Sequence, residues 1–311
     1  MAINLSKHLR IIVSLCFFAF ACFCSANNKP RNGGGFKGMF IFGSSVVDNG
    51  NNNNLKGSTS KANFLPYGID FNVGPIKPTG RFSNGKNVAD LIGDHLKLPL
   101  IPSFANTQTQ GDSILYGVNF ASGGSGIFNE TGVIWGKVIS LHEQITNFEG
   151  VTLPKLESRL RSQRDKILPD YLFLVAAGNN DYTFQLLLSP QNASQSAQAF
   201  AAKLIDFYSV QLKMKHELPG SDFMILDSVK VITDILNNGN STVNLQQVNR
   251  HARLMAPPAM IGDAMPFFYL NHYSESACAA IAAKVYGSRN KSEVFPVNLH
   301  RFSHRQHSNL H

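Results

Sequence analysis

A serine hydroxyl that directly follows a buried strand and a tight turn can serve as a nucleophile. The apolar residues 39–42 of this sequence are followed by Gly43, Ser44 and Ser45. Glycine allows a sharp turn, and open α/β folds place their sites at the carboxyl ends of such strands. Ser45 is therefore a candidate nucleophile. The alternative is that this serine only caps or shapes the turn, which is the commoner role of a serine in such a place.

Two later segments carry groups that could hold a developing negative charge. The glycine-rich run at 122–126 follows the mostly apolar residues 118–121 and offers the backbone amide of Gly123. The run at 178–181 follows another apolar segment and offers the side-chain amide of Asn180. One such donor is worth about 2.7–4 kcal/mol to an oxyanion in serine hydrolases. Each run could instead be a plain turn, and the first lacks the lysine and the spacing of a phosphate-binding P-loop.

A candidate base lies near the C-terminal end of the sequence. His272 precedes a run that has a helical pattern through Ala283, and histidine is the side chain whose ordinary pKa suits proton transfer near neutral pH. A single histidine is more commonly structural or solvent-facing. Four further histidines have helical spacing and could bind a metal ion, although a flexible terminal tail is the simpler interpretation; they are His300, His304, His307 and His311.

The elements that must position these groups alternate between short apolar runs and helical patterns. Four runs are nearly continuous in apolar residues, as expected for strands covered on both faces; they lie at 39–42, 118–121, 171–176 and 223–226. A long helix is predicted from about 196 to 218 and is ended by Pro219 and Gly220. The pattern predicts an α/β fold with a parallel sheet covered by helices.

The first 26 residues are typical of a secretory signal peptide. A basic start precedes an apolar stretch at 11–24, and two small residues follow it. The alternative is a membrane anchor, but these 14 residues are fewer than the roughly 20 that span a bilayer. We therefore expect residues 1–26 to be a signal peptide cleaved near Ala26, no membrane span, and one exported domain at 27–311 whose only cysteine is Cys278.

The surface of the exported domain is expected to be moderately basic. Loss of Lys7 and Arg10 with the signal peptide lowers the formal charge from +8 to +6. Such a surface could bind anionic cell-wall polymers or lipid headgroups weakly, or it could simply be solvated. No block of lysine and arginine is interleaved with aromatic residues, so nucleic acid is not an expected partner. Four sequons are candidate glycosylation sites, at Asn129, Asn192, Asn240 and Asn290.

Taken together, the candidate groups carry a family resemblance. The order of the SGNH hydrolases is matched by Ser45, Gly123, Asn180 and His272, and the surrounding sequence resembles the plant GDSL esterase/lipases. Runs that are especially similar to that family lie at 46–53, 65–71 and 79–86. The resemblance implies a three-layer α/β/α sandwich of flavodoxin-like type with a parallel sheet. Together with the expected signal peptide, it predicts a secreted, extracellular enzyme of the cell wall or apoplast.

The resemblance further implies a mechanism that uses neither a metal nor an organic cofactor. Ser45 would attack the carbonyl carbon of a small-molecule or lipid ester, and His272 would remove the serine proton. The Ser45 amide, the Gly123 amide (with that of Gly124 as the near alternative) and the Asn180 side chain would hold the oxyanion. Water would then release the acid, with His272 acting again as base.

The sequence departs from the family pattern in three places. Gly-Ser-Ser-Val at 43–46 replaces the usual Gly-Asp-Ser-Leu, and Tyr269 stands where the family has the aspartate of the triad. Loss of that aspartate in a related triad costs about 10⁴ in turnover. A family strand is also missing between Leu212 and Lys213. The alternative function is therefore that of a catalytically impaired relative, which binds an acyl or sugar ligand without turning it over.

Overall fold

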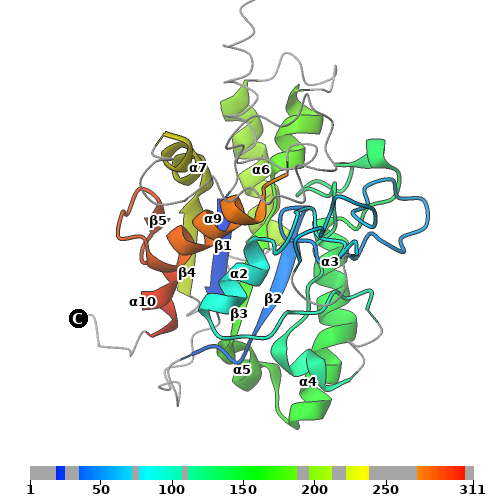
Figure 1. The fold of residues 1–311 in the computed structure, drawn as a ribbon. Coiled ribbons are helices and arrows are strands. Elements are labelled where there is room, and N and C mark those ends of the chain that lie inside the picture. The colour runs from blue at the N-terminus through cyan, green and yellow to red at the C-terminus, as the bar shows by residue number, and fades with distance from the viewer. Residues whose placement is uncertain are drawn as a thin grey trace, which may run out of the picture.

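The computed structural model of the chain is described here for residues 19–24, 35–71, 77–106, 111–187, 196–211, 222–237 and 272–304. Its centre is a five-stranded sheet with the order β2-β3-β1-β4-β5 (Figure 1). The strands are β1 (Ala19–Cys24), β2 (Gly38–Gly43), β3 (Tyr171–Ala176), β4 (Asp222–Asp227) and β5 (Val294–Phe295).

Three of the four strands predicted from the apolar runs are confirmed, because β2, β3 and β4 contain them. The fourth, at 118–121, lies extended beside β2 and forms two isolated parallel bridges through Asn119, one with Ile41 and one with Ser103. Two backbone hydrogen bonds hold it there: Ile41 N–H donates to the Val118 carbonyl, and Phe120 N–H donates to the Ile41 carbonyl. The glycine-rich run therefore begins beside β2, at the edge of the sheet.

The sheet has a parallel core with two strands that run the other way. Strand β2 pairs with β3 in parallel, and β1 pairs antiparallel with both β3 and β4, so β2, β3 and β4 point in the same direction. Strand β5 is antiparallel to β4 at the far edge. The expected parallel α/β arrangement is thus present in β2, β3 and β4, and β1 lies between two of them.

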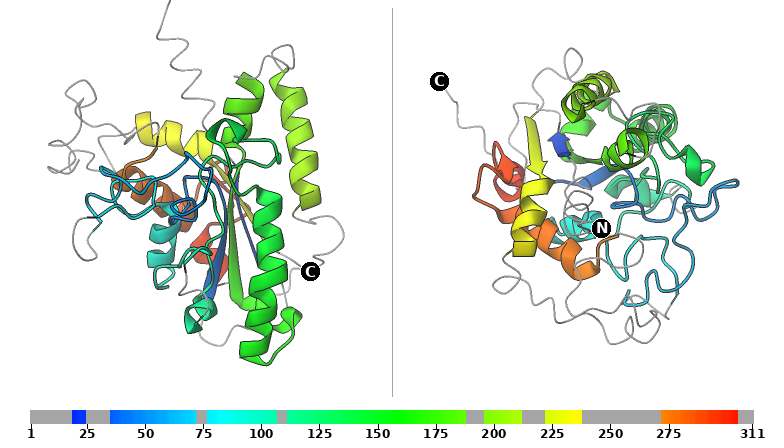
Figure 2. Two further views of the ribbon diagram at one scale, coloured as in Figure 1. Left: turned by 90° about the vertical axis from the view of Figure 1, so that its right-hand side faces the viewer. Right: turned by 90° about the horizontal axis from the view of Figure 1, so that it is seen from above.

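Helices cover both faces of the sheet and make a three-layer α/β/α sandwich (Figure 2). One face carries α2 (Val88–His95), α7 (Ser228–Asn237), α9 (Glu275–Gly287) and α10 (Leu299–Ser303). The other face carries α3 (Leu141–Asn147), α4 (Leu153–Leu160), α5 (Arg164–Ile167) and α6 (Ala197–Gln211). Shorter helical turns lie at Asp112–Tyr116, Val133–Trp135, Phe148–Thr152, Leu168–Asp170 and Asp181–Leu187.

The alternation of side chains along the strands explains why the apolar runs are continuous. In β2, Met39 and Ile41 pack into the core under α2 and α9, whereas Phe40 and Phe42 pack into the core under α3 and α4. Both faces are covered, so every residue of β2 and of β3 is buried. The second core is aromatic, with the Phe42 and Phe120 rings stacked at 5.1 Å between centroids. This packing fixes the carboxyl ends of the strands, from which the candidate site residues extend.

Two sequence predictions lie partly outside the described residues. The helix expected from about 196 to 218 is present as α6, which begins at Ala197 and is described to Gln211. Its expected end at Pro219 and Gly220 lies outside the described residues.

Strand β1 falls within the expected signal peptide and lies in the middle of the sheet (Figure 1). Among the residues described, no helix is long and apolar enough to cross a membrane.

Candidate active site

Ser45 lies in a tight turn at the carboxyl end of β2. Gly43 ends the strand with a φ of 135°, and a Cβ at this position would collide with the Ala176 carbonyl, so only glycine fits. The Ser44 amide donates to the same carbonyl at 3.0 Å, and the Val47 amide closes the turn onto the Ser44 carbonyl at 3.1 Å. Ser45 is 5% exposed. Its own backbone N–H donates to no protein acceptor among the described residues, which leaves it available to a ligand.

A buried carboxylate, Asp48, ties this turn to the glycine-rich loop. Its Oδ1 accepts the amides of Gly50 at 2.7 Å and Asn51 at 2.9 Å, and its Oδ2 accepts the amide of Gly123 at 2.9 Å. Burial raises the pKa of Asp48 to about 6, although the three amides and the charge of Arg81 act in the opposite direction. A carboxyl group with this pKa changes its charge in the mildly acidic range.

The Gly123 amide is therefore already engaged. Its N–H donates to Asp48, and its carbonyl accepts the side-chain amide of Asn52 at 2.8 Å. The next residue, Gly124, has a φ of 83°, and its N–H donates to no acceptor within the described part of the chain. Of the two glycine amides expected near an oxyanion, Gly124 has the uncommitted donor, and Gly123 would first have to leave Asp48.

Asn180 is the fourth residue after the end of β3 and is bonded to the same loop. Its Nδ2 donates to the Ser125 carbonyl at 2.7 Å, which uses one of the two N–H bonds of the amide group. The Ser125 hydroxyl in turn donates to the Gly43 carbonyl at 3.0 Å. The neighbouring Asn179 Oδ1 accepts the Ser44 hydroxyl at 2.9 Å. The asparagine turn is thus attached both to the loop at 122–126 and to the turn that carries Ser45.

Asp181 fixes the loop from its other end. The carboxylate accepts the Ile127 amide at 2.8 Å, the Phe128 amide at 2.9 Å and the Thr131 hydroxyl at 2.7 Å. Burial raises the pKa of the Asp181 carboxyl above its usual range, while these hydrogen bonds oppose the rise. Gly126 lies against this carboxylate, where a Cβ would collide with it. Residues 123–128 are therefore held between two buried carboxylates.

His272 is half-buried against aromatic rings at the entrance to α9. Its ring centroid lies 4.8 Å from that of Phe82 and 6.2 Å from that of Tyr67. Phe82 also covers Gly123, because a Cβ on that glycine would collide with the Phe82 ring. The phenylalanine therefore lies between the histidine and the glycine-rich loop. Tyr269, the residue expected in place of the triad aspartate, lies outside the described residues.

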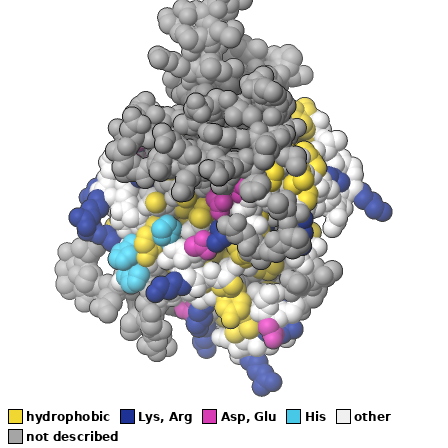
Figure 3. Space-filling view, in the orientation of Figure 1, with side chains coloured by type: hydrophobic (Ala, Val, Ile, Leu, Met, Phe, Trp, Pro, Cys, Tyr) yellow, Lys and Arg dark blue, Asp and Glu magenta, His cyan; other side chains and the backbone are white. Residues whose placement is uncertain are grey.

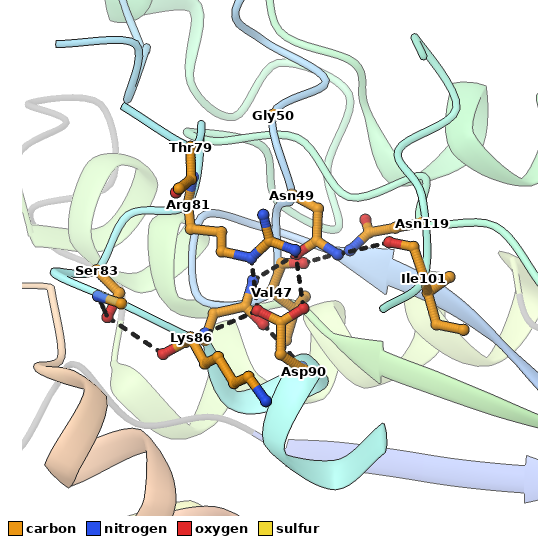
Figure 4. Close-up of polar contacts among 12 residues, drawn as sticks. Val47, Asn49, Gly50, Thr79, Arg81, Ser83, Lys86, Asp90, Ile101 and Asn119 are labelled. Atoms are coloured by element: carbon orange, nitrogen blue, oxygen red, sulfur yellow. Dashed lines mark hydrogen bonds and ion pairs between the residues drawn. The ribbon is translucent and has the colours of Figure 1, made fainter. Parts of the chain in front are cut away.

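A network of buried polar side chains surrounds the residues that follow Ser45 (Figure 4). The Arg81 guanidinium makes two hydrogen bonds to the Asp90 carboxylate, at 2.6 and 3.0 Å. The Asn119 side chain donates to the Val47 carbonyl at 2.6 Å, and the Asn49 side chain donates to the Ile101 carbonyl at 2.9 Å. The turn after Ser45 is thereby bonded to segments far away in the sequence.

Sequence reasoning missed two residues of this framework. One is Asp48, which stands in a recognised run but whose partner Gly123 is 75 residues away. The other is Gln144 in α3, which is fully buried. Its Oε1 accepts the Gly43 amide at 2.8 Å, and its Nε2 donates to the Gly43 carbonyl at 2.9 Å. The only available signal was a polar side chain three positions after the apolar Leu141, which is too weak to indicate a role.

The remaining predicted sites differ in how far the structure describes them. Asn129 and Asn290 are exposed, whereas Asn192 and Asn240 lie outside the described residues. Of the C-terminal histidines, His300 and His304 stack at 4.6 Å between centroids, and a histidine patch is visible on the face in Figure 3. Within the ranges described, no group of three or more potential ligands could hold a metal ion.

Comparison with known proteins adds a family match to this geometry. The family model described as GDSL-like Lipase/Acylhydrolase matches residues 39–217. The chain is 47% identical over 147 residues to GDSL esterase/lipase At5g08460 of Arabidopsis thaliana, covering 47% of this chain and 37% of that protein. It is 39% identical over 219 residues to GDSL esterase/lipase At1g71691 of the same plant, covering 68% and 55%.

A third relative, GDSL esterase/lipase At1g74460 of Arabidopsis thaliana, is 40% identical over 190 residues, covering 60% of this chain and 51% of that protein. The chain therefore spans about half the length, or less, of these curated relatives. No solved structure matches the sequence.

Proposed function

The chain belongs to the family of GDSL-like lipases and acylhydrolases, and on that premise we propose that it hydrolyses carboxylic esters with Ser45 as nucleophile and His272 as base. Activity on acyl esters is the property of the family. The roles of individual residues, the ester that is cleaved and the activity of this shortened chain are the content of the proposal.

One observation carries the proposal. The turn with Ser45, the loop with Gly123 and the turn with Asn180 are joined by three hydrogen bonds. Asp48 accepts the Gly123 amide, Asn180 donates to the Ser125 carbonyl, and Ser44 donates to Asn179. Three segments from different parts of the chain are thereby held at the carboxyl end of the parallel strands, where α/β folds place their sites. A preorganised arrangement of amides is what stabilises an oxyanion.

In the proposed reaction, the Ser45 hydroxyl attacks the ester carbonyl carbon while His272 takes the hydroxyl proton. The alcohol leaves with a proton from the imidazolium, and an acyl group remains on the serine oxygen. His272 then removes a proton from water, whose oxygen attacks the acyl carbon and releases the acid. The Ser45 amide, one amide of the pair Gly123 and Gly124, and the Asn180 side chain hold the oxyanion, with no metal or organic cofactor.

The unusual serine before the nucleophile has an identifiable partner. Family members commonly have aspartate at the position of Ser44, and here the Ser44 hydroxyl donates to Asn179 Oδ1. A hydroxyl can therefore connect the nucleophile turn to the asparagine turn without a charge. This contact supports the proposal that the altered motif is compatible with a working site.

The test is reaction with a fluorophosphonate probe, which is attacked only by an activated serine. We expect the purified full-length chain to be labelled and to cleave short-chain p-nitrophenyl esters. Ser45→Ala should abolish both reactions. The matched control is Ser209→Ala, which removes a hydroxyl on α6 that, among the described residues, donates to the Asp206 carbonyl of its own helix. Labelling or ester cleavage that survives Ser45→Ala at the wild-type rate would exclude Ser45 as the nucleophile.

A second candidate function is binding of an acyl or sugar ligand without turnover. It is favoured by Tyr269 in place of the triad aspartate and by the hydrogen bond that commits the Gly123 amide to Asp48. Under this alternative, p-nitrophenyl butyrate would produce at most one equivalent of nitrophenol, or none. A folded chain that shows many turnovers dependent on Ser45 would eliminate it.

We also propose export to the extracellular space, on the basis of the signal-like residues 1–26. The exposed sequons at Asn129 and Asn290 are sterically open to glycosylation, and the basic composition suits weak binding to anionic wall polymers. Expression of a tagged chain in plant cells tests this directly. We expect the protein in the apoplastic wash, with a mobility shift that a glycosidase removes. Retention of all the protein inside the cell without glycans would contradict export.

A further inference from the structure

The central position in the sheet is filled by the N-terminal segment of the chain. Strand β1 lies between β3 and β4 (Figure 1). Phe20 to Phe23 pair with residues 173–176 of β3, and Ala19 to Cys24 pair with residues 222–227 of β4, in both cases antiparallel. This segment therefore has hydrogen-bonded neighbours on both sides.

No other described segment joins β3 to β4. Neighbouring strands lie about 4.7–4.9 Å apart, so β3 and β4 on either side of β1 are about 9–10 Å apart. Backbone groups cannot bond directly across such a gap. Both strands point in the same direction and are connected in sequence through α6. The gap between them has the width of a single strand.

We propose that the space between β3 and β4 is a strand-binding slot, and that residues 19–24 occupy it in the folded chain. The slot presents one row of N–H and C=O groups from each side, which recognise any extended segment by its backbone. The segment Ala-Phe-Ala-Cys-Phe-Cys has the continuous apolar composition of a strand covered on both faces. It takes the place of the strand that is missing between β3 and β4.

The same residues lie inside the expected signal peptide, so folding and processing make opposite demands on them. Cleavage near Ala26 would break the covalent link between β1 and the rest of the chain, and loss of the cleaved segment would leave the facing edges of β3 and β4 open. The uncleaved chain is accordingly the stable form, and a processed chain keeps its fold only as long as the cleaved segment stays bound. This inference concerns the sheet and does not depend on the proposed ester hydrolysis.

The experiment cuts the folded full-length chain between β1 and β2. A recognition sequence for a specific protease is placed within residues 27–34, and the intact protein is folded before it is cut. Size exclusion and mass spectrometry then follow the N-terminal fragment. We expect the fragment to co-elute with the remainder as a one-to-one complex of monomer size. Amide exchange in β3 and β4 should stay as slow as before the cut.

Two outcomes would overturn the proposal. In the first, the fragment dissociates and the remainder keeps its cooperative melt and its slow exchange in β3 and β4. In the second, the cut protein elutes as a dimer that holds the fragment of a neighbouring copy, which would make a second chain the occupant. Unfolding of the remainder when the fragment is displaced by dilution would support the proposal.

A pair of proline variants in the uncut chain gives an independent measurement. Ala21→Pro removes a backbone donor from a strand that is bonded on both sides, so exchange in β3 and β4 should accelerate at least tenfold, or the chain should fail to fold. Ser14→Pro places the same residue in the same apolar stretch but outside β1, and it should leave that exchange unchanged. Equal exchange rates in the two variants and the wild type would overturn the assignment of residues 19–24.

Discussion

Replacement of Asp48 by asparagine should change how the stability of the protein depends on pH. Asp48 is buried completely and has a pKa of about 6 in the folded protein, compared with an ordinary value of 3.8. Since the folded-state pKa lies above the unfolded value, the folded protein favours the protonated carboxyl group. This group therefore contributes stability that is fully present below about pH 4 and is lost as the pH rises through 6.

The size of the effect follows from the shift. The pKa shift is about two units, and one unit corresponds to 1.36 kcal/mol, so the contribution of Asp48 to the free energy of unfolding changes by roughly 3 kcal/mol from low to high pH. Roughly 2 kcal/mol of this change falls between pH 4.5 and pH 7.5. Asparagine at position 48 does not titrate. Its NH₂ group would face the Gly123 amide in place of Oδ2, which adds a cost of about 1–3 kcal/mol that is independent of pH.

The quantity to measure is the difference between the unfolding free energies of wild type and Asp48→Asn, from urea titrations at several pH values. The single tryptophan, Trp135, is a convenient fluorescence probe. Other titrating groups are common to both proteins and cancel in the difference. We expect the difference to grow in favour of the wild type by about 2 kcal/mol as the pH falls from 7.5 to 4.5.

An exposed carboxylate provides the matched control. Asp206→Asn on α6 should leave the unfolding free energy within about 0.5 kcal/mol of the wild type, because water already solvates that side chain. If the unfolding free energies of wild type and Asp48→Asn change in parallel with pH, burial does not raise the pKa of Asp48. If the advantage of the wild type grows toward high pH instead, the predicted direction of the pKa shift is wrong.

Three further substitutions test other contacts of the site. Gln144→Met removes the side-chain oxygen that accepts the buried Gly43 amide at the end of β2. It should lower the free energy of unfolding by about 1–3 kcal/mol in urea titration. A loss below about 0.5 kcal/mol would contradict this role. Phe82→Leu removes the ring that packs against His272, so fluorophosphonate labelling of Ser45 should slow about 2- to 10-fold. An unchanged rate would argue that this ring does not position His272. Arg81→Met leaves the buried Asp90 carboxylate without its oppositely charged partner and should destabilise the fold by about 3–5 kcal/mol. Thermal or urea unfolding measures this loss, and a neutral effect would show that the ion pair is dispensable.

The parts of the fold that the sequence predicted are those dictated by burial on both faces. Strands β2 and β3 are continuous apolar runs because their successive side chains enter two different cores. The run at 118–121 has a similar composition but forms only isolated bridges, with Ile41 and with Ser103. Its Asn119 bonds outward as well, donating through its backbone to the Pro102 carbonyl, so the segment is shared between β2 and an outer loop.

Some residues of the candidate site can be predicted from the local sequence, whereas others are placed by contacts with distant parts of the chain. Ser45, Gly123 and Asn180 could be proposed from sequence because each follows an apolar run, and parallel strands bring their carboxyl ends together. Gln144 could not, because its burial depends on where α3 packs against Gly43, 101 residues earlier. The competition between Asp48 and an oxyanion for the Gly123 amide is likewise visible only from the hydrogen bond itself.

The N-terminal segment is where sequence patterns reach a physical limit. A signal peptide and a strand buried on both faces are both short, continuous apolar runs, so the pattern at 11–24 fits either role equally well. What separates them is the rest of the sheet. With a family strand missing between α6 and β4, β4 could have moved to pair with β3 directly, but in the folded chain residues 19–24 keep the two strands apart and bond to both. Because β3 and β4 are joined through these six residues, we expect the stability of the protein to depend on whether the segment stays with it.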